Sequence, residues 1–461
     1  MKKSIIFFFF FLFSITFSQS LFSNNQDTKK LLGCTHELTK NYFLYGDDKR
    51  IKKIEIDINK YRDWVVNNIK IITSNTRFIP NILKKKFNSK IKVTYEGGDH
   101  CVLTGRVRHS GDAKDHIKLK GNSIIQSLDI SLDYGNIKGV TKFKLFKPNV
   151  RGVLDDVAIQ TQLLRDFGYL APRSYRVNTR VNQMNSVMLF QEKAAKELLE
   201  FNNRREGPIL EGDQKYFFKL VQDIPDNNLS NWSVGTPFLR NKSAQAMLSK
   251  STNARLVNKG IVQKEIYLKS VNDLNLIYLY WANRFKDDKN NFFYFDYDLD
   301  NELLSYFDKN NNIKLDVYNL FMQSTNSQHA LSVSNRKFFW NSLENLFEPI
   351  NYDSNPDIDR QKPTTTTVNY RLPVSRYVEE SFTVLEQKLN NVDLDILYEK
   401  LLIGDINLSK QDVKKKLEKI SLNLKNIKDT YLTKIEKEKI EYNYFKEIKN
   451  IKKKFINARS E

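Results

Sequence analysis

Two segments in the second half of the chain carry side chains that could bind a metal ion. His329 and Asn335 lie in the stretch Gln328–Arg336, and Asp353 follows an expected strand at Phe347–Ile350. Amide and carboxylate oxygens are ligands that suit Mg²⁺ in proteins. A histidine, an asparagine and, after a short hairpin, an aspartate also occur in this order in sites of phosphoryl transfer. The spacing therefore points to phosphoryl transfer as a candidate chemistry.

Phosphoryl transfer also needs cations for the phosphates, because its catalysis consists of positioning and charge neutralisation. Lys144 lies in a stretch where lysine and apolar residues alternate, Arg151 follows it, and Lys120 precedes a glycine turn. Each residue alone is ambiguous, since a strand lysine is most often a surface residue and a lone histidine such as His329 is most often structural. Asp353 could equally cap a turn. Only the ordered set is informative.

The elements that must position these residues follow from periodicity. Strands show a period of two, and helices show apolar residues at a spacing of three and four. Strands are predicted over residues 128–133, 142–146, 174–181 and 187–190. Helices are predicted over residues 153–167, 193–203, 274–285, 315–322 and 378–389, with a basic amphipathic helix over 406–461. The chain begins strand-rich and ends helical, which predicts an α+β fold.

The ordered set resembles the CotH-like kinases, an atypical kinase family named after spore coat protein H. The segments that carry the resemblance are Lys118–Ser123, Phe143–Leu145, Leu170–Arg173, Gln191-Glu192, Arg204–Leu210, Gln328–Arg336 and Phe347–Asp353. They span the middle half of the chain, and Arg204–Leu210 is similar to a sub-branch found in bacterial envelopes. The resemblance implies a protein-kinase-like two-lobed fold, with a strand-rich small lobe and a mainly helical large lobe.

The resemblance also implies an activity and a set of roles. The protein would transfer phosphate from ATP, with Mg²⁺, to a secreted protein or an envelope glycan. The implied site residues are Lys120, Lys144 and Arg151 for the phosphates, Glu192 at the hinge between the lobes, Asn335 and Asp353 for the metal, and His329, which orders the loop.

The chain departs from the kinase pattern at the catalytic base. Protein kinases carry an aspartate two residues after the loop histidine, and this position is Leu331. A base would then come from Asp353, Asp357, Asp359 or His329 itself. A glycine-rich phosphate loop is also missing from the sequence. The alternative is a catalytically inactive kinase-like module that binds anionic envelope polysaccharide or a membrane surface.

The N-terminus and the charge indicate where the protein acts. A basic start and a short apolar stretch predict a signal peptide over residues 1–20, with an uncleaved anchor as the alternative. An extracytoplasmic location, in the periplasm or cell envelope, is therefore expected. The net charge of +20 favours contact of the basic C-terminus with an anionic membrane or polysaccharide. Nucleic-acid binding is not expected of an exported chain without a recognition module.

Cysteine and aspartate spacing offers two further candidate metal sites. Cys34 and Cys101 could form one disulfide, stay unpaired, or join neighbouring histidines at a zinc site, although C-x₂₋₄-C spacing is missing. The stretch Asp308–Asn312 mimics a calcium loop but lacks its glycine, so a solvated turn is expected. The expected organisation is a signal peptide 1–20, a polar or helical segment 21–95, a strand-rich nucleotide-side lobe 96–223, a helical lobe 224–405 and the basic helix 406–461.

Overall fold

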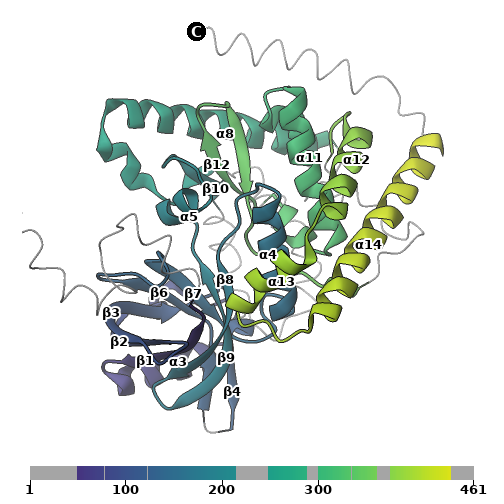
Figure 1. Cartoon of the computed structure of the whole chain (residues 1–461). Coiled ribbons are helices and arrows are strands. Elements are labelled where there is room, and N and C mark those ends of the chain that lie inside the picture. The colour runs from purple at the N-terminus through teal and green to yellow at the C-terminus, as the bar shows by residue number, and fades with distance from the viewer. Residues whose placement is uncertain are drawn as a thin grey trace, which may run out of the picture.

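The structure is a computed structural model with a mixed α+β architecture. It describes residues 49–213 (without Arg77 and Asn122), 248–287, 299–360 (without Ser334) and 374–437. A strand-rich N-terminal part is followed by a helical part (Figure 1). The predicted signal peptide lies outside the described residues. Among the helices that are described, none is long and apolar enough to cross a membrane.

Seven strands close into a barrel in the order β1-β2-β3-β6-β7-β9-β8. They are β1 (Ile51–Ile58), β2 (Phe87–Tyr95), β3 (His100–His109), β6 (Leu128–Leu132), β7 (Lys142–Phe146), β8 (Ser174–Val181) and β9 (Met184–Glu192). Neighbours are antiparallel except β1 and β8, whose parallel pairing closes the barrel. Alternate residues fill the interior, as period-two strands require. A closed barrel was not expected from the resemblance.

The barrel begins earlier in the chain than the sequence analysis placed it. The segment expected to be polar or helical, 21–95, contains β1, β2 and the helix α3 (Tyr61–Thr73). Ile54, Ile56 and Ile58 of β1 are buried and alternate with charged residues. Trp64 of α3 packs edge-on against Phe87, with the ring centroids 5.1 Å apart. The alternation of isoleucine with charged residues in β1 is short and lies in a lysine-rich stretch, so it was not recognised as a strand.

The helical part surrounds a second sheet with the order β11-β10-β12-β13. Its strands are β10 (Ile209–Gly212), β11 (Ser249–Ser251), β12 (Lys337–Asn341) and β13 (Leu346–Ile350). The helices are α4 (Leu154–Asp166), α5 (Lys196–Phe201), α8 (Ile261–Asp287), α10 (Asn301–Leu304), α11 (Lys309–Ser324), α12 (Val378–Asn390), α13 (Leu394–Ile403) and α14 (Lys410–Lys437). Figure 1 shows α11, α12 and α14 side by side, and these three pack on one another.

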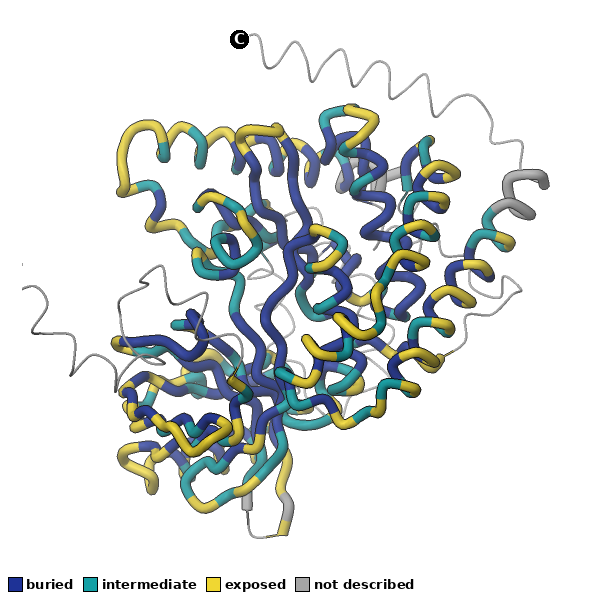
Figure 2. The backbone as a smooth tube through the Cα atoms, viewed as in Figure 1, coloured by how far each residue is buried: buried dark blue, intermediate teal, exposed yellow. Residues whose placement is uncertain are grey.

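Helix α4 joins the two parts of the molecule. It lies between β7 and β8 in the chain, and its Ile159, Leu163 and Leu164 are buried in one core with residues of α11, α12 and α14. The helix ends before Gly168, whose φ of +87° suits glycine. The buried residues in Figure 2 run along the strands and along the inward sides of the helices.

The basic C-terminal helix is confirmed as amphipathic over the described residues of α14. Val413, Ile420, Leu424 and Ile427 are buried against the rest of the helical part, whereas its outer side is exposed (Figure 2). A coiled coil needs an apolar seam that is open to a partner chain. In α14 this side is covered by the protein's own helices.

A buried carboxylate in α11 makes stability depend on pH. Asp316 accepts hydrogen bonds from Asn301 Nδ2 at 2.7 Å, from the Ser375 backbone N–H at 2.8 Å and from the Ser375 hydroxyl at 2.6 Å. Burial raises the pKa of Asp316 to about 6, although these hydrogen bonds act in the opposite direction. Between about pH 4 and pH 6 the folded protein therefore holds a proton that the unfolded chain releases.

We expect Asp316→Asn to remove this pH dependence. Because the folded pKa lies above the unfolded one, the stability due to the protonated carboxyl is present below about pH 4 and is lost as the pH rises to about 6. The loss of stability amounts to about 3 kcal/mol, because the pKa of Asp316 differs by about 2 between the folded and the unfolded protein. Urea unfolding at pH 4 and pH 7 measures it: the variant should gain relative to wild type at pH 7. A difference that does not change with pH would contradict the assignment.

Candidate functional site

Five of the predicted site residues meet between the barrel and one end of the β12–β13 hairpin. They are Lys144 in β7, Arg151 in the loop before α4, His329 in the 3₁₀ turn η6 (Gln328–Leu331), Asn335 just before β12, and Asp353 just after β13. Lys337 and Ile350 face each other across the hairpin. Asn335 and Asp353 therefore flank the same end of it.

His329 joins the loop before β12 to the segment after β13. Its Nε2 lies 3.1 Å from Asn335 Nδ2 and 3.7 Å from Asp353 Oδ1. Asn335 Nδ2 also donates to the His329 backbone carbonyl at 3.2 Å. Arg151 forms an ion pair with Asp353. Both candidate metal ligands thus lie beside one imidazole nitrogen.

The backbone at Asp353 is held in a sparsely populated conformation. Asp353 has a φ of +53° and Asn355 a φ of +51°, both in the left-handed region. Gly152, next to Arg151, packs so closely that a Cβ there would lie 2.5 Å from the Pro356 carbonyl oxygen. The loop that carries Arg151 is therefore pressed against the segment that carries Asp353. Aspartate and asparagine adopt this conformation more readily than other non-glycine residues, which suits the turn after β13.

Tyr352 is a site residue that the sequence analysis missed. Lys144 Nζ donates to its hydroxyl at 3.2 Å. Lys337 Nζ, Lys144 Nζ and Arg151 Cζ lie 4.1, 5.3 and 5.6 Å from the ring centroid. The charge of Lys144, followed by those of Lys337 and Arg151, lowers the pKa of Tyr352 to about 6 despite its burial. These three residues are here called the cation cluster, and their charges favour the ionised form of the Tyr352 phenol.

Lys337 is the second residue that was missed. It is buried at the start of β12 and pairs with Glu211 of β10. Burial lowers its pKa to about 8, and the charges of Lys144, Lys193 and Arg151 act in the same direction. The signal in the sequence was a lysine at the head of an otherwise apolar strand. Nothing in the sequence marked Tyr352, because an aromatic residue that follows a strand is expected to pack in the hydrophobic core.

Gln160 of α4 holds the segments on both sides of the site. Its Nε2 donates to Thr325 Oγ1 at 3.0 Å and to the Ser327 hydroxyl, shortly before His329. Its Oε1 accepts from the Ser354 hydroxyl at 2.7 Å, immediately after Asp353. One buried amide thus fixes the spacing of the two segments that carry the candidate metal ligands.

Helix α14 pairs with one of the candidate bases, Asp359. Lys416 lies 2.7 Å from Asp156 of α4 and 2.7 Å from Asp359. Leu331, at the position of the kinase aspartate, is fully buried. Of the candidate bases, His329 and Asp353 are the ones that the structure brings to the cation cluster.

The other two predicted residues, Glu192 and Lys120, lie on different elements from the cation cluster. Glu192 ends β9 just before α5, as the hinge position requires, but its carboxylate is held by Arg173 Nη2 at 2.6 Å and Nε at 2.9 Å, with both side chains buried. Glu192 is therefore part of a buried ion pair. Lys120 ends β4 (Ile117–Lys120), which forms with β5 (Ser123–Gln126) a hairpin separate from the barrel. The Lys120 side chain lies outside the described residues.

The structure bears on the disulfide and zinc alternatives for the two cysteines. Cys101 is disulfide-bonded, and the chain's only other cysteine, Cys34, lies outside the described residues. In the part of the chain that the structure describes, no three His, Cys, Asp or Glu side chains gather as a metal site. Mg²⁺ needs fewer protein ligands, since it keeps waters and phosphate oxygens. The amide oxygen of Asn335 and the carboxylate of Asp353 fit that requirement.

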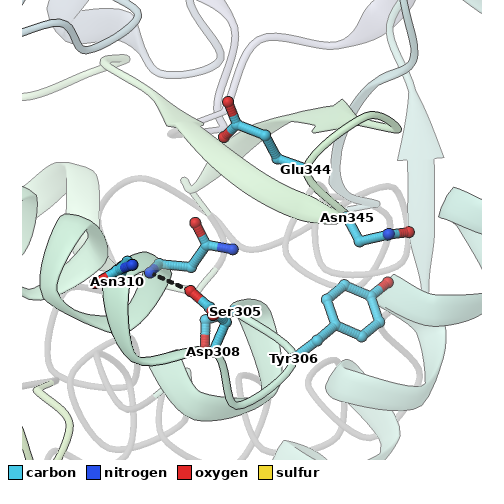
Figure 3. Close-up of a pocket in the computed structure, with 7 residues that line it drawn as sticks. Ser305, Tyr306, Asp308, Asn310, Glu344 and Asn345 are labelled. Atoms are coloured by element: carbon cyan, nitrogen blue, oxygen red, sulfur yellow. Dashed lines mark hydrogen bonds between the residues drawn. The ribbon is translucent and has the colours of Figure 1, made fainter.

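A polar pocket of about 450 Å³ lies at the opposite end of the β12–β13 hairpin (Figure 3). It is lined by Ser305, Tyr306, Asp308, Asn310, Asn311, Glu344 and Asn345. Asp308 caps α11 by accepting from the Asn311 backbone N–H at 2.8 Å. The calcium-loop-like stretch is therefore a helix start and not the solvated turn that was expected.

Comparison with models of protein families finds no match, and comparison with curated proteins finds none either. A fold class alone does not imply an activity. Any assignment of function therefore rests on the chemistry of the site.

Proposed function

We propose that the protein is an exported, CotH-like phosphotransferase that uses ATP with Mg²⁺. The observation that supports this most directly is the convergence of Lys144, Arg151 and Lys337 with Asn335 and Asp353 at one end of the β12–β13 hairpin. Cations for phosphates and oxygen ligands for a metal are the two requirements of phosphoryl transfer. The acceptor we propose is a secreted protein or an envelope glycan.

The order of the elements supports a kinase-like arrangement. A lysine-bearing strand, β7, is followed by α4, by the antiparallel pair β8 and β9, and by a link at Glu192. Helix α11, the loop at His329, the β12–β13 hairpin and Asp353 then follow. Protein kinases present their nucleotide lysine, catalytic loop and metal aspartate in the same order. The closed barrel is the main difference from a kinase small lobe.

The chain's own residues would bind the phosphates, hold the metal ion and accept a proton. Lys144 would donate to a phosphate oxygen in place of the Tyr352 hydroxyl. Asn335 and Asp353 would hold Mg²⁺, which supplies charge neutralisation to the phosphates. Arg151 would turn from Asp353 to the phosphates. His329, half exposed and 3.7 Å from Asp353, would accept the proton of the acceptor hydroxyl.

Transfer of the terminal phosphate tests the proposal. The mature chain is incubated with Mg²⁺ and ATP labelled at the γ-phosphate, together with secreted proteins or an envelope glycan fraction. We expect labelled acceptor that depends on Mg²⁺ and disappears in His329→Ala and Asn335→Ala. Absence of both binding and transfer would overturn the proposal.

A catalytically inactive binding module is the second candidate, favoured by the buried Leu331 where an aspartate base would lie. Such a module would bind anionic polysaccharide or membrane, and added salt would weaken this binding steeply. Strong salt dependence without phosphate transfer would favour it over the enzyme.

A further inference from the structure

The face of the barrel that carries Lys144 is a row of charged and polar residues. Lys144 pairs with Asp129 of β6 on one side and with Gln191 of β9 on the other. Asp129 pairs in turn with Arg108 of β3, and Gln191 with Ser174 of β8. Residues opposite each other in paired strands share one face of a sheet. Phe146 and Leu189 continue this face beyond Lys144, where they pack with Val157 of α4 and are fully buried, so the protein's own helix covers the apolar end of the face.

Two other cations near Lys144 form ion pairs on that face. Arg108 Nη2 lies 2.7 Å from Asp129 Oδ2, and Lys193 Nζ lies 2.9 Å from Asp129 Oδ1. Lys193 follows β9 directly, so it occupies the link between the two parts of the molecule. Arg108 and Lys193 thus place two cations, paired with one carboxylate, beside Lys144.

The backbone N–H groups of Glu192 and Lys193, at the link between the two parts of the molecule, already donate to backbone carbonyls. The Glu192 N–H donates to the Arg173 carbonyl at 3.0 Å, and the Lys193 N–H donates to the Lys142 carbonyl at 3.0 Å. A purine is recognised by free backbone or side-chain donors and acceptors beside an apolar surface. These two N–H groups are not free to serve it.

The cation cluster itself suits a chain of phosphates. Lys144 has no carboxylate partner among the described residues, and Lys337 is held over the Tyr352 ring by Glu211. An exported protein is also removed from the main cellular pool of ATP.

We propose that the site recognises its donor through the phosphate chain and not through the base. Inorganic triphosphate and nucleoside triphosphates with different bases then bind with similar affinity. This inference rests on the proposed function, because it specifies the ligand class of the same site.

Calorimetric titration of the full mature chain with Mg²⁺ and four probes tests the inference. The probes are ATP, GTP, inorganic triphosphate and adenosine. We expect the Kd values of GTP and triphosphate to lie within about 3-fold of that of ATP, and adenosine not to bind. Binding of adenosine, or ATP binding more than about 10-fold tighter than triphosphate, would overturn the inference and leave the proposed function standing. Absence of binding by all probes would overturn both.

A pair of variants locates the binding. Lys337→Met should weaken ATP and triphosphate by the same factor, about 10-fold or more, because it removes one cation from the phosphates. Lys414→Met, at an exposed lysine of α14, should change neither. Unchanged binding by a folded Lys337→Met protein would contradict the cation cluster as the site. The probe series on wild type remains decisive if that variant does not fold.

Discussion

Lys144→Met is expected to lower kcat/KM for phosphate transfer by about 100-fold or more while the protein stays folded. Lys144 is half-buried in β7, and its ammonium donates to the Tyr352 hydroxyl at 3.2 Å. Methionine keeps the length of the side chain and removes the charge. Steady-state kinetics, with circular dichroism as a check on folding, measures the effect.

The matched control is Lys142→Met, at an exposed lysine of the same strand. Its activity should be that of wild type. Lys144→Met also removes the charge that lowers the pKa of Tyr352 most, so this pKa should rise from about 6 towards its usual value, which ultraviolet absorbance of tyrosinate follows. Equal activities of the two variants would show that Lys144 does not contact the phosphates.

Gln160→Leu is expected to destabilise the protein by about 3 kcal/mol, because it leaves buried hydroxyl groups without their partner. The amide of Gln160 contacts Thr325, Ser327 and Ser354, and all three are buried. Leucine fills the space but can neither donate nor accept. Urea unfolding followed by tryptophan fluorescence gives the free energy of unfolding.

Gln162→Leu is the control on the same helix, and it should cost less than about 1 kcal/mol because its hydrogen bonds are partly exposed. If the two variants lost the same stability, Gln160 would not hold the two segments in place. A folded Gln160→Leu protein should also bind Mg²⁺ with ATP more weakly, since both metal-side segments lose their common support.

Local periodicity predicted single elements well. The expected helix 153–167 is α4 at Leu154–Asp166, and the expected strand 174–181 is β8 at Ser174–Val181. Closure of the barrel was not predictable in this way, because β1 pairs with β8 across more than a hundred residues of chain. Long-range strand pairing leaves no local signal in one sequence.

The candidate site was predictable to the extent that its residues lie in ordered motifs. His329, Asn335 and Asp353 do so, and the structure brings them together. Lys337 and Tyr352 belong to the site only because β12, β13 and β7 meet in the fold. Arg173 and Glu192 face each other at the open end of the β8–β9 hairpin, so their ion pair follows from the register of two strands that periodicity alone did not align.

The most direct measurement for the central claim is the thermal shift of the mature protein with Mg²⁺ and ATP, beside Asp353→Asn. Ligand at a hundred times its Kd stabilises the folded state by about 2.7 kcal/mol, which raises the melting temperature measurably. Each protein is compared with its own ligand-free and metal-free states, because the variant also loses the ion pair with Arg151. We predict a Mg²⁺-dependent shift in wild type that Asp353→Asn lacks. No shift in either protein, or equal shifts in both, would contradict a nucleotide and metal site at Asp353.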